Sequence, residues 1–202
     1  MTMTYHTPYT VELQCHPTTR AQSVRGVEAR VAWGHGRALV LTFALEGDLT
    51  QLRIPVPQPS RRTDGLWQHT CFEAFIRHKD EPAYYEFNFS PSGEWAAYAF
   101  RCYRDGMPLL QDLDPCIAVR STGERLELDA IIRLDCLPPG QPYTRLQLAL
   151  STVIEDKQSR LSYWALTHPP DRPDFHHLDA FALELERPDT DPTSEAAEER
   201  KQ

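Results

Sequence analysis

Hydrophobic and polar residues alternate with a period of two over much of the chain. Residues 27–33 place four apolar side chains on one face and the charged Glu28 and Arg30 on the other, and residues 39–45 repeat the alternation after a short turn with two glycines. A period of two is that of a β-strand, because successive side chains point to opposite faces. The two segments therefore predict a β-hairpin.

Further segments with the same alternation bring the predicted number of strands to about ten. They are residues 72–76, 85–89, 95–102, 117–119, 126–132, 146–150, 161–165 and 181–185. Residues 95–102 would also fit one face of a helix, but the tight turn before them and their aromatic content favour a strand. Short strands with hairpin-length links predict an all-β fold, an antiparallel β-sandwich of two packed sheets with few short helices.

The pattern predicts one folded domain with an extension at each end. Residues 27–186 carry the alternation and form the predicted sandwich, and residues 1–26 form an N-terminal extension with the first strand. Residues 187–202 are acidic and contain no large apolar side chain. We therefore expect a disordered acidic tail after the domain.

Charge and cysteine spacing narrow the classes of partner and the compartment. The formal net charge of −8 disfavours nucleic acid and anionic membrane surfaces as partners. No apolar run approaches the roughly 20 residues that span a bilayer, and the first residues show no secretory signal.

The five cysteines are far apart and form no CxxC motif. We therefore expect reduced, mostly buried thiols in a cytoplasmic protein.

Two neighbouring strands predict a face that mixes polar groups with aromatic rings. On residues 71–77 and 84–90, the positions opposite the core include Glu73, Glu86 and Asn88 among aromatic side chains. Sugars need oriented hydrogen-bonding groups for their hydroxyls and aromatic planes for their C–H faces. The alternative is a solvated outer face whose glutamates pair with nearby arginines. The pattern alone leaves these two interpretations open.

The central and C-terminal parts of the chain resemble the DOMON-like proteins, which are related to the family 9 carbohydrate-binding modules. The resemblance is carried by the stretches DGLWQHTCFEAFIRH, YYEFNFSPSGEWAAYAFRCYRDG and YWALTHPPDRPDFHHLDAF, and it runs from roughly Val27 to Leu185. It implies a β-sandwich and, in this chain, a module that binds a small, sugar-like ligand.

The resemblance also implies a set of binding residues. In the sugar-binding relatives two aromatic rings sandwich a terminal sugar, and a glutamate just inside the strand after the first ring binds its hydroxyls; Trp67 and Glu73 match these by position. A neighbouring strand in the relatives supplies an arginine and an asparagine two residues apart. Here the asparagine is Asn88, and Glu86 stands where the arginine would be.

The second ring of the relatives comes from the last loop. In this chain that loop offers Phe175, His176 or His177, and we take Phe175 and His176 as ligand-binding candidates. Arg61 and Arg62 in a proline-rich, basic loop complete the predicted set.

Three alternatives to sugar binding are a glycoside hydrolase, a haem-binding domain and a metal site. Glu73 and Glu86 could be the two carboxylates of a glycoside hydrolase, although no GxSxG, HExxH, P-loop or GxGxxG motif is present. Some DOMON relatives hold haem through a methionine and a histidine, for which Met107 is the candidate here. His168, His176 and His177 lie in one loop with three aspartates and could bind a metal, but adjacent histidines on an extended chain point in opposite directions.

Taken together, the residues favour a binding module over an enzyme. We expect no cofactor and no metal. The sequence leaves the oligomeric state open, because exposed edge strands permit a dimer without requiring one.

Overall fold

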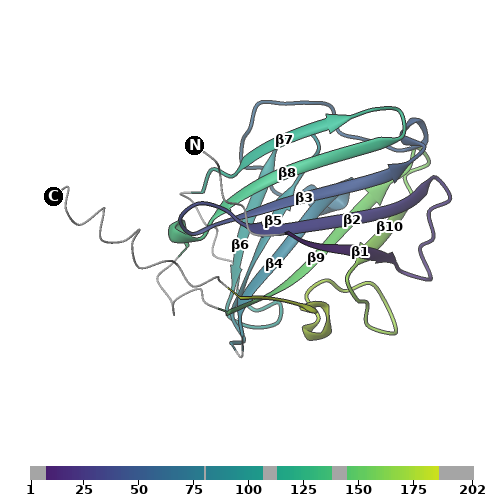
Figure 1. Cartoon of the computed structure of the whole chain (residues 1–202). Coiled ribbons are helices and arrows are strands. Elements are labelled where there is room, and N and C mark those ends of the chain that lie inside the picture. Colours follow the sequence, from purple (N-terminus) through teal and green to yellow (C-terminus); the bar gives the residue numbers. More distant parts are fainter. Residues whose placement is uncertain (1–7, 80, 107–112, 138–144, 187–202) are drawn as a thin grey trace.

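The computed structural model describes residues 8–79, 81–106, 113–137 and 145–186 (Figure 1). Within these ranges the chain forms eleven strands and four single-turn 3-10 helices, and no α-helix. The strands are β1 (Tyr9–Cys15), β2 (Val24–Trp33), β3 (Ala38–Gly47), β4 (Cys71–His78), β5 (Tyr84–Phe89), β6 (Trp95–Phe100), β7 (Cys116–Ser121), β8 (Arg125–Arg133), β9 (Arg145–Glu155), β10 (Leu161–Ala165) and β11 (Leu183–Glu186). The 3-10 helices are η1 (Leu49–Gln51), η2 (Leu66–Gln68), η3 (Leu134–Cys136) and η4 (Leu178–Ala180). Among the described residues, no helical segment has the length and apolar character of a membrane span.

The strands form one continuous antiparallel sheet in the order β6-β5-β4-β9-β10-β1-β2-β3-β8-β7, with β11 paired to β9. Residues 9–13 of β1 pair with β2, whereas Gln14 and Cys15 pair with β10. We call β1, β2, β3, β8 and β7 the first half-sheet, and the remaining strands the second half-sheet. The all-β, antiparallel prediction is confirmed, but in place of two separate sheets there is a single curled one, because β1 is hydrogen-bonded to both halves.

The main core lies between the two half-sheets, which face each other (Figure 1). On β3 and β4 the alternating residues predicted to point inward are buried, as Phe43 and Phe72 show. The centroids of these two rings lie 5.2 Å apart. The indole N–H of Trp33 donates to the carbonyl of Glu186 over 2.9 Å and ties the end of β11 to β2. The period-two pattern thus identified the main core and the β2–β3 hairpin correctly.

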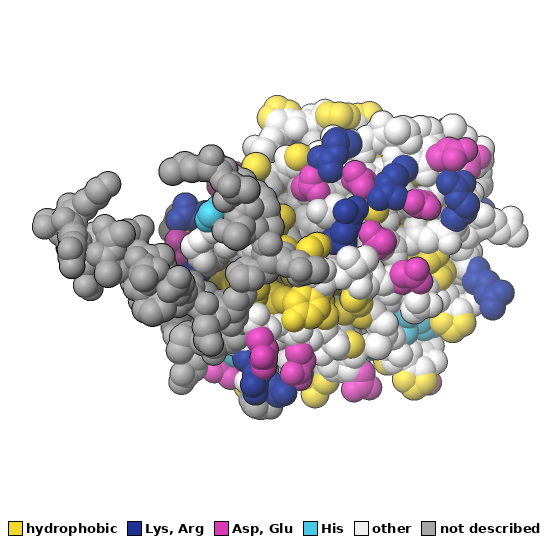
Figure 2. All heavy atoms as spheres, in the orientation of Figure 1, with side chains coloured by type: hydrophobic (Ala, Val, Ile, Leu, Met, Phe, Trp, Pro, Cys, Tyr) yellow, Lys and Arg dark blue, Asp and Glu magenta, His cyan; other side chains and the backbone are white. Residues whose placement is uncertain are grey.

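The outer face of the first half-sheet is solvated. Figure 2 shows basic and acidic side chains intermixed over it. Arg30 lies 3.2 Å from a carboxylate oxygen of Glu127, and Arg120 lies 2.7 Å from Asp129. Exposed pairs of this kind contribute little to stability, roughly 0–1 kcal/mol each. This face has the character of an ordinary protein surface.

The outer face of the second half-sheet is buried instead. A second hydrophobic cluster lies on it, with Phe75 from β4, Tyr84 from β5 and Phe100 from β6. Phe175 and Phe181, from the segment before β11, cover this cluster. β4 is therefore buried on both faces. Its alternate residues belong to two different hydrophobic clusters, and neither face is exposed to solvent.

Two expectations about apolar positions were wrong. Phe181 was placed in the last strand, but it lies two residues before β11 and belongs to the second cluster. The five cysteines are free, in line with the expected reduced thiols, but most were expected to be buried and only Cys71 is. Three are exposed because they lie outside the cores: Cys102 in a loop, Cys116 on the edge strand β7 and Cys136 at the end of η3. The domain boundaries remain predictions, and the acidic tail lies outside the described residues.

Candidate ligand-binding site

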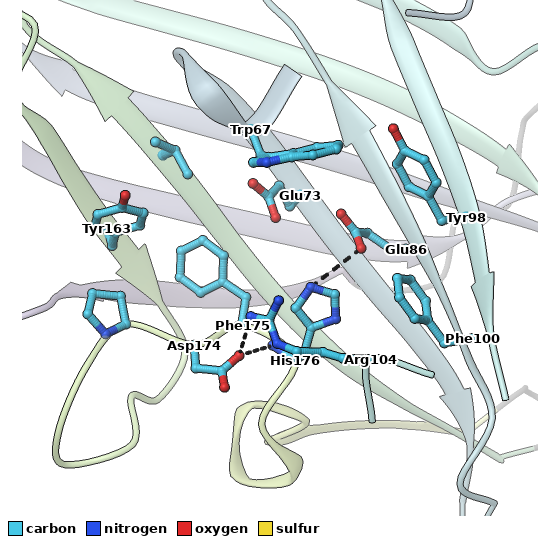
Figure 3. A pocket seen from close by; sticks show the side chains of 12 residues that line it. Trp67, Glu73, Glu86, Tyr98, Phe100, Arg104, Tyr163, Asp174, Phe175 and His176 are labelled. Carbon is cyan, nitrogen blue, oxygen red and sulfur yellow. Dashed lines mark hydrogen bonds and ion pairs between the residues drawn. The ribbon is translucent and has the colours of Figure 1, made fainter. Parts of the chain in front are cut away.

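A cavity of about 400 Å³ opens on the outer face of the second half-sheet (Figure 3). Its floor is formed by β4, β5 and β6, and η2 and the segment 173–176 form opposite walls. The side chains around it are those of Trp67, Glu73, Glu86, Tyr98, Phe100, Arg104, Val153, Tyr163, Pro173, Asp174, Phe175 and His176. Acidic groups lie on the floor and aromatic rings around the rim, as Figure 3 shows.

The floor carries a row of polar residues that are short of hydrogen-bond partners. On β4, Glu73 pairs with Asn88 of β5 on one side and with Ser151 of β9 on the other, so the three share one face. All three are at least 97 % buried. Among the described residues, Glu73 Oε1, Asn88 Oδ1 and Ser151 Oγ have no hydrogen-bond partner. Buried polar atoms are nearly always paired, so this row calls for a partner from outside the chain.

The two glutamates on the floor resist ionisation. Burial raises the pKa of Glu73 well above its usual range, and the negative charge of Glu86 raises it further, against a smaller lowering by Arg104. Burial raises the pKa of Glu86 to about 7, although the hydrogen bond from Asn88 and the charge of Arg104 lower it. Near neutral pH the pair therefore holds a proton that exposed carboxyl groups would have lost.

Hydrogen bonds orient Glu86 and its neighbour His176. Asn88 Nδ2 donates to Glu86 Oε1 over 2.8 Å. The backbone N–H of Arg104 donates to the hydroxyl of Tyr84 over 3.1 Å, and this hydroxyl lies 2.8 Å from His176 Nδ1. With the tyrosine as donor to Nδ1, the ring proton of His176 is on Nε2, which lies 3.7 Å from Glu86 Oε2.

His176 is neutral near pH 7. Burial lowers its pKa to about 4, the charge of Arg104 lowers it further, and Asp174 acts in the opposite direction. The approach of His176 to Glu86 is therefore that of a neutral imidazole N–H to a carboxyl group, and not an ion pair. The neutral imidazole of His176 therefore supplies no positive charge to the carboxyl groups of the floor.

Arg104 and Asp174 fasten the loop after β6 to the last loop. Arg104 Nη2 donates to Asp174 Oδ1 over 2.9 Å, and the hydroxyl of Tyr103 donates to Asp174 Oδ2 over 2.6 Å. Burial would raise the pKa of Asp174, but the hydrogen bonds from Tyr103 and Arg104 outweigh it and lower the pKa. Arg104 has φ = 52°, a left-handed conformation that costs a residue other than glycine about 1–3 kcal/mol. This strain fits a residue held in place for binding.

Aromatic rings form the rim. Trp67 lies on η2 and is 39 % exposed. η2 follows Gly65, whose φ of 80° favours glycine. The Trp67 and Tyr98 rings form a T-shaped pair with centroids 5.8 Å apart, and on the opposite wall the centroids of Phe175 and Tyr163 lie 6.0 Å apart. Apolar planes therefore stand on both sides of the acidic floor.

The structure brings most of the predicted site residues together. Trp67, Glu73, Glu86, Phe175 and His176 all line the cavity. Of the predicted Glu86 and Asn88 pair, the asparagine is fully buried under the floor and acts on the glutamate rather than forming a wall.

Arg61 and Arg62 do not line the cavity. Arg61 Nε lies 2.8 Å from Glu94 Oε1 on the surface, and Arg62 lies 2.7 Å from Asp64. The guanidinium of Arg62 also stacks over the Tyr98 ring at 5.7 Å. Arg62 therefore contacts the rim through Tyr98, whereas Arg61 pairs with Glu94 outside the cavity.

The three histidines considered for a metal site point to different places. His168 Nε2 lies 2.8 Å from the carbonyl oxygen of Gln14, and His177 Nδ1 lies 3.5 Å from Asp179 Oδ2. Only His176 reaches the cavity. Over the described ranges, no group of three histidine, cysteine or acidic side chains could hold a metal ion. Met107, the haem candidate, lies outside those ranges.

Several lining residues escaped the sequence analysis. Tyr98 and Phe100 pair with Glu86 and Tyr84 across β5 and β6, so extending the period-two argument by one strand would have found them. Tyr163 follows in the same way from the β9–β10 hairpin. No sequence signal points to Arg104, because it enters the site from a loop.

Comparison with solved structures shows the same fold in proteins of very different sequence. A Bacteroides uniformis protein assigned provisionally to carbohydrate binding has a TM-score of 0.65 at 16 % identity, over 91 % of this chain and 86 % of its own. A family 9 carbohydrate-binding module from Caldicellulosiruptor kristjanssonii, solved with cellotriose, has a TM-score of 0.52 at 13 % identity, over 89 % of this chain and 85 % of its own. No protein-family model and no curated protein matches the sequence.

Proposed function

We propose that the protein is a DOMON-like carbohydrate-binding module that takes one sugar unit into the cavity between Trp67 and Phe175. The observation that carries this proposal is the row of buried, unpartnered polar atoms under an aromatic rim. A volume of about 400 Å³ lies within the range of small-ligand sites, roughly 300–1,000 Å³.

The polar floor supports the proposal through its hydrogen-bonding capacity. Sugar hydroxyls can donate to the carboxyl group of Glu73, which lines the cavity and whose Oε1 no described residue satisfies. Each such bond relieves a buried group whose desolvation costs about 1–3 kcal/mol. A ligand without hydroxyl or amine groups would leave that cost in place.

The rim supports the proposal through its geometry. A pyranose ring has C–H faces that pack on aromatic planes, and Trp67 and Phe175 offer such planes on opposite walls. The solved structures of similar fold include a family 9 module in complex with cellotriose. That likeness extends to the fold and agrees with a sugar ligand for this chain.

A glycoside hydrolase is the second candidate, and the raised pKa values of Glu73 and Glu86 favour it. Such enzymes need one protonated and one ionised carboxyl group at neutral pH. Against it, the hydrogen bond from Asn88 holds Glu86 in the floor. Hydrolysis of aryl glycosides during a binding assay would support the enzyme, and intact ligand supports the binding module.

Replacing Trp67 with alanine should weaken sugar binding by about 1–3 kcal/mol, because the variant loses the apolar area that the sugar buries on the indole. Titration calorimetry measures this, after a thermal-shift screen has identified a sugar that raises the melting temperature by mass action. Since the ring is 39 % exposed, the melting temperature without sugar should change little.

Tyr9→Ala is the matched control for this experiment. Tyr9 is 46 % exposed and lies on β1, away from the cavity, so its loss should leave the affinity unchanged. Equal affinities in wild type and Trp67→Ala would exclude the rim as the binding surface.

We also propose that the protein works in a reducing compartment, the cytoplasm. All five cysteines are free, and three of them are exposed to oxidation. Denatured protein should titrate five thiols per chain without added reductant. Fewer than five in protein purified without oxidant would contradict the proposal.

A further inference from the structure

The cavity carries more negative than positive groups. Its acidic side chains are Glu73, Glu86 and Asp174, and its one guanidinium is that of Arg104. Arg104 is already paired with Asp174 at 2.9 Å, and His176 is neutral. The negative charge that Glu73 and Glu86 carry once they lose a proton is therefore without a partner of opposite sign among the side chains that line the cavity.

The two glutamates are placed so that one cation can meet both. Glu73 pairs with Asn88 and Phe75 pairs with Glu86, so the two glutamates are diagonal neighbours on the same face of β4 and β5. The Cα atoms of such neighbours lie roughly 7–8 Å apart, with the side chains within reach of each other. Figure 3 shows both carboxyl groups directed into the same cavity.

The floor is also matched to a cation that donates hydrogen bonds. Glu73 and Glu86 both line the cavity. Glu73 Oε1 lacks a donor among the described residues, and Glu86 Oε2 has the distant contact with His176 at 3.7 Å. A primary ammonium has three N–H donors and no acceptor. A quaternary ammonium would leave these oxygens unsatisfied.

The rim favours the same kind of ligand. Tyr98 and Phe100 line the cavity next to Glu86, and aromatic faces attract cations as well as sugar C–H groups. A hydroxyl in place of the ammonium would satisfy one oxygen and leave the charge of the pair unbalanced.

We propose that the ligand is a sugar with a free amine, and that its ammonium group binds between Glu73 and Glu86. This inference rests on the sugar-binding function proposed above and names the class of sugar. The ammonium displaces protons that the glutamate pair otherwise holds, and these protons leave to the buffer. N-acetylation of the amine removes the charge and two of the three donors, so it abolishes this contact.

The experiment compares glucosamine, galactosamine and mannosamine with their N-acetyl and neutral parent sugars by titration calorimetry. At about pH 6.5 the sugar amine is protonated. We expect at least one amino sugar to bind about ten-fold or more tightly than both of its uncharged counterparts, a difference of about 1.4 kcal/mol. Its binding heat should change with the ionisation enthalpy of the buffer, because protons are released.

Glu73→Gln tests whether the ammonium group of the sugar binds at the floor of the cavity. This variant keeps the shape of the side chain and loses its charge, so the preference for the amine should fall to about two-fold or less while the fold is retained, as its circular dichroism spectrum will show. Glu28→Gln, at a half-buried position on β2 outside the cavity, removes the same charge elsewhere and should keep the full preference.

The outcomes separate this inference from the proposed function. Neutral sugars that bind as tightly as amino sugars overturn the inference and leave carbohydrate binding intact. If no sugar binds, both the inference and the proposed carbohydrate-binding function are overturned. Cyclohexylamine binding as tightly as an amino sugar would support the cation site and contradict the carbohydrate-binding function.

Discussion

Replacing Phe72 with alanine should lower the free energy of unfolding by about 3–5 kcal/mol, the usual cost of removing a buried phenylalanine ring. Phe72 is fully buried on the core face of β4 and packs against Phe43 of the other half-sheet at 5.2 Å. Its loss opens a cavity between the halves, whose rigid strands can close it only in part. Urea denaturation followed by tryptophan fluorescence measures the change.

Leu178→Ala provides the comparison for Phe72→Ala. Leu178 is 58 % exposed on η4, so its truncation should change stability by about 0.5 kcal/mol or less. Similar small losses in both variants would mean that the half-sheets do not share a core, and the architecture described above would be wrong.

Replacing Glu86 with glutamine should stabilise the protein increasingly as the pH rises. The pKa of Glu86 is about 7 in the folded protein and 4.5 in the unfolded chain. Between these values the folded state keeps a proton that the unfolded state has lost, so a rise in pH lowers the free energy of unfolding of the wild type. At 1.36 kcal/mol per pKa unit the loss amounts to about 3 kcal/mol, complete above pH 7.

The measurement is the difference in unfolding free energy between Glu86→Gln and wild type from about pH 4 to 8. His176, whose folded pKa of about 4 lies below its usual 6.5, makes both proteins more stable as the pH rises. This effect has the opposite sign and largely cancels in the difference. A difference that widens by about 3 kcal/mol supports a buried, reluctantly ionised Glu86. A constant difference would contradict it.

The site combines stability costs in a way that fits a binding function. Glu73, Glu86 and Arg104 each hold an unfavourable state: two buried carboxyl groups and one strained backbone conformation. Such costs persist where the surrounding structure outweighs them, and they concentrate at binding sites. The two hydrophobic clusters on the faces of β4 supply the stability that outweighs these costs.

The sequence by itself determined the strands and the faces of their residues. The alternation along β2, β3, β4 and β5 is strong because each strand has a side in the main core, and a period of two leaves only one way to orient it. Pairing β4 with β5 then placed Glu73 beside Asn88, as the register confirms. These are local properties, decided by neighbouring residues and short turns.

Only the tertiary structure decided what covers the outer face of β4. Arg104, Asp174 and Phe175 come from loops, where no periodicity reports the direction of a side chain. The tertiary structure also decided that a single sheet is formed. The switch of β1 from β2 to β10 depends on hydrogen bonds between strands more than a hundred residues apart. The sequence therefore determined the floor of the candidate site, whereas its walls, and the burial that perturbs its glutamates, follow from long-range packing.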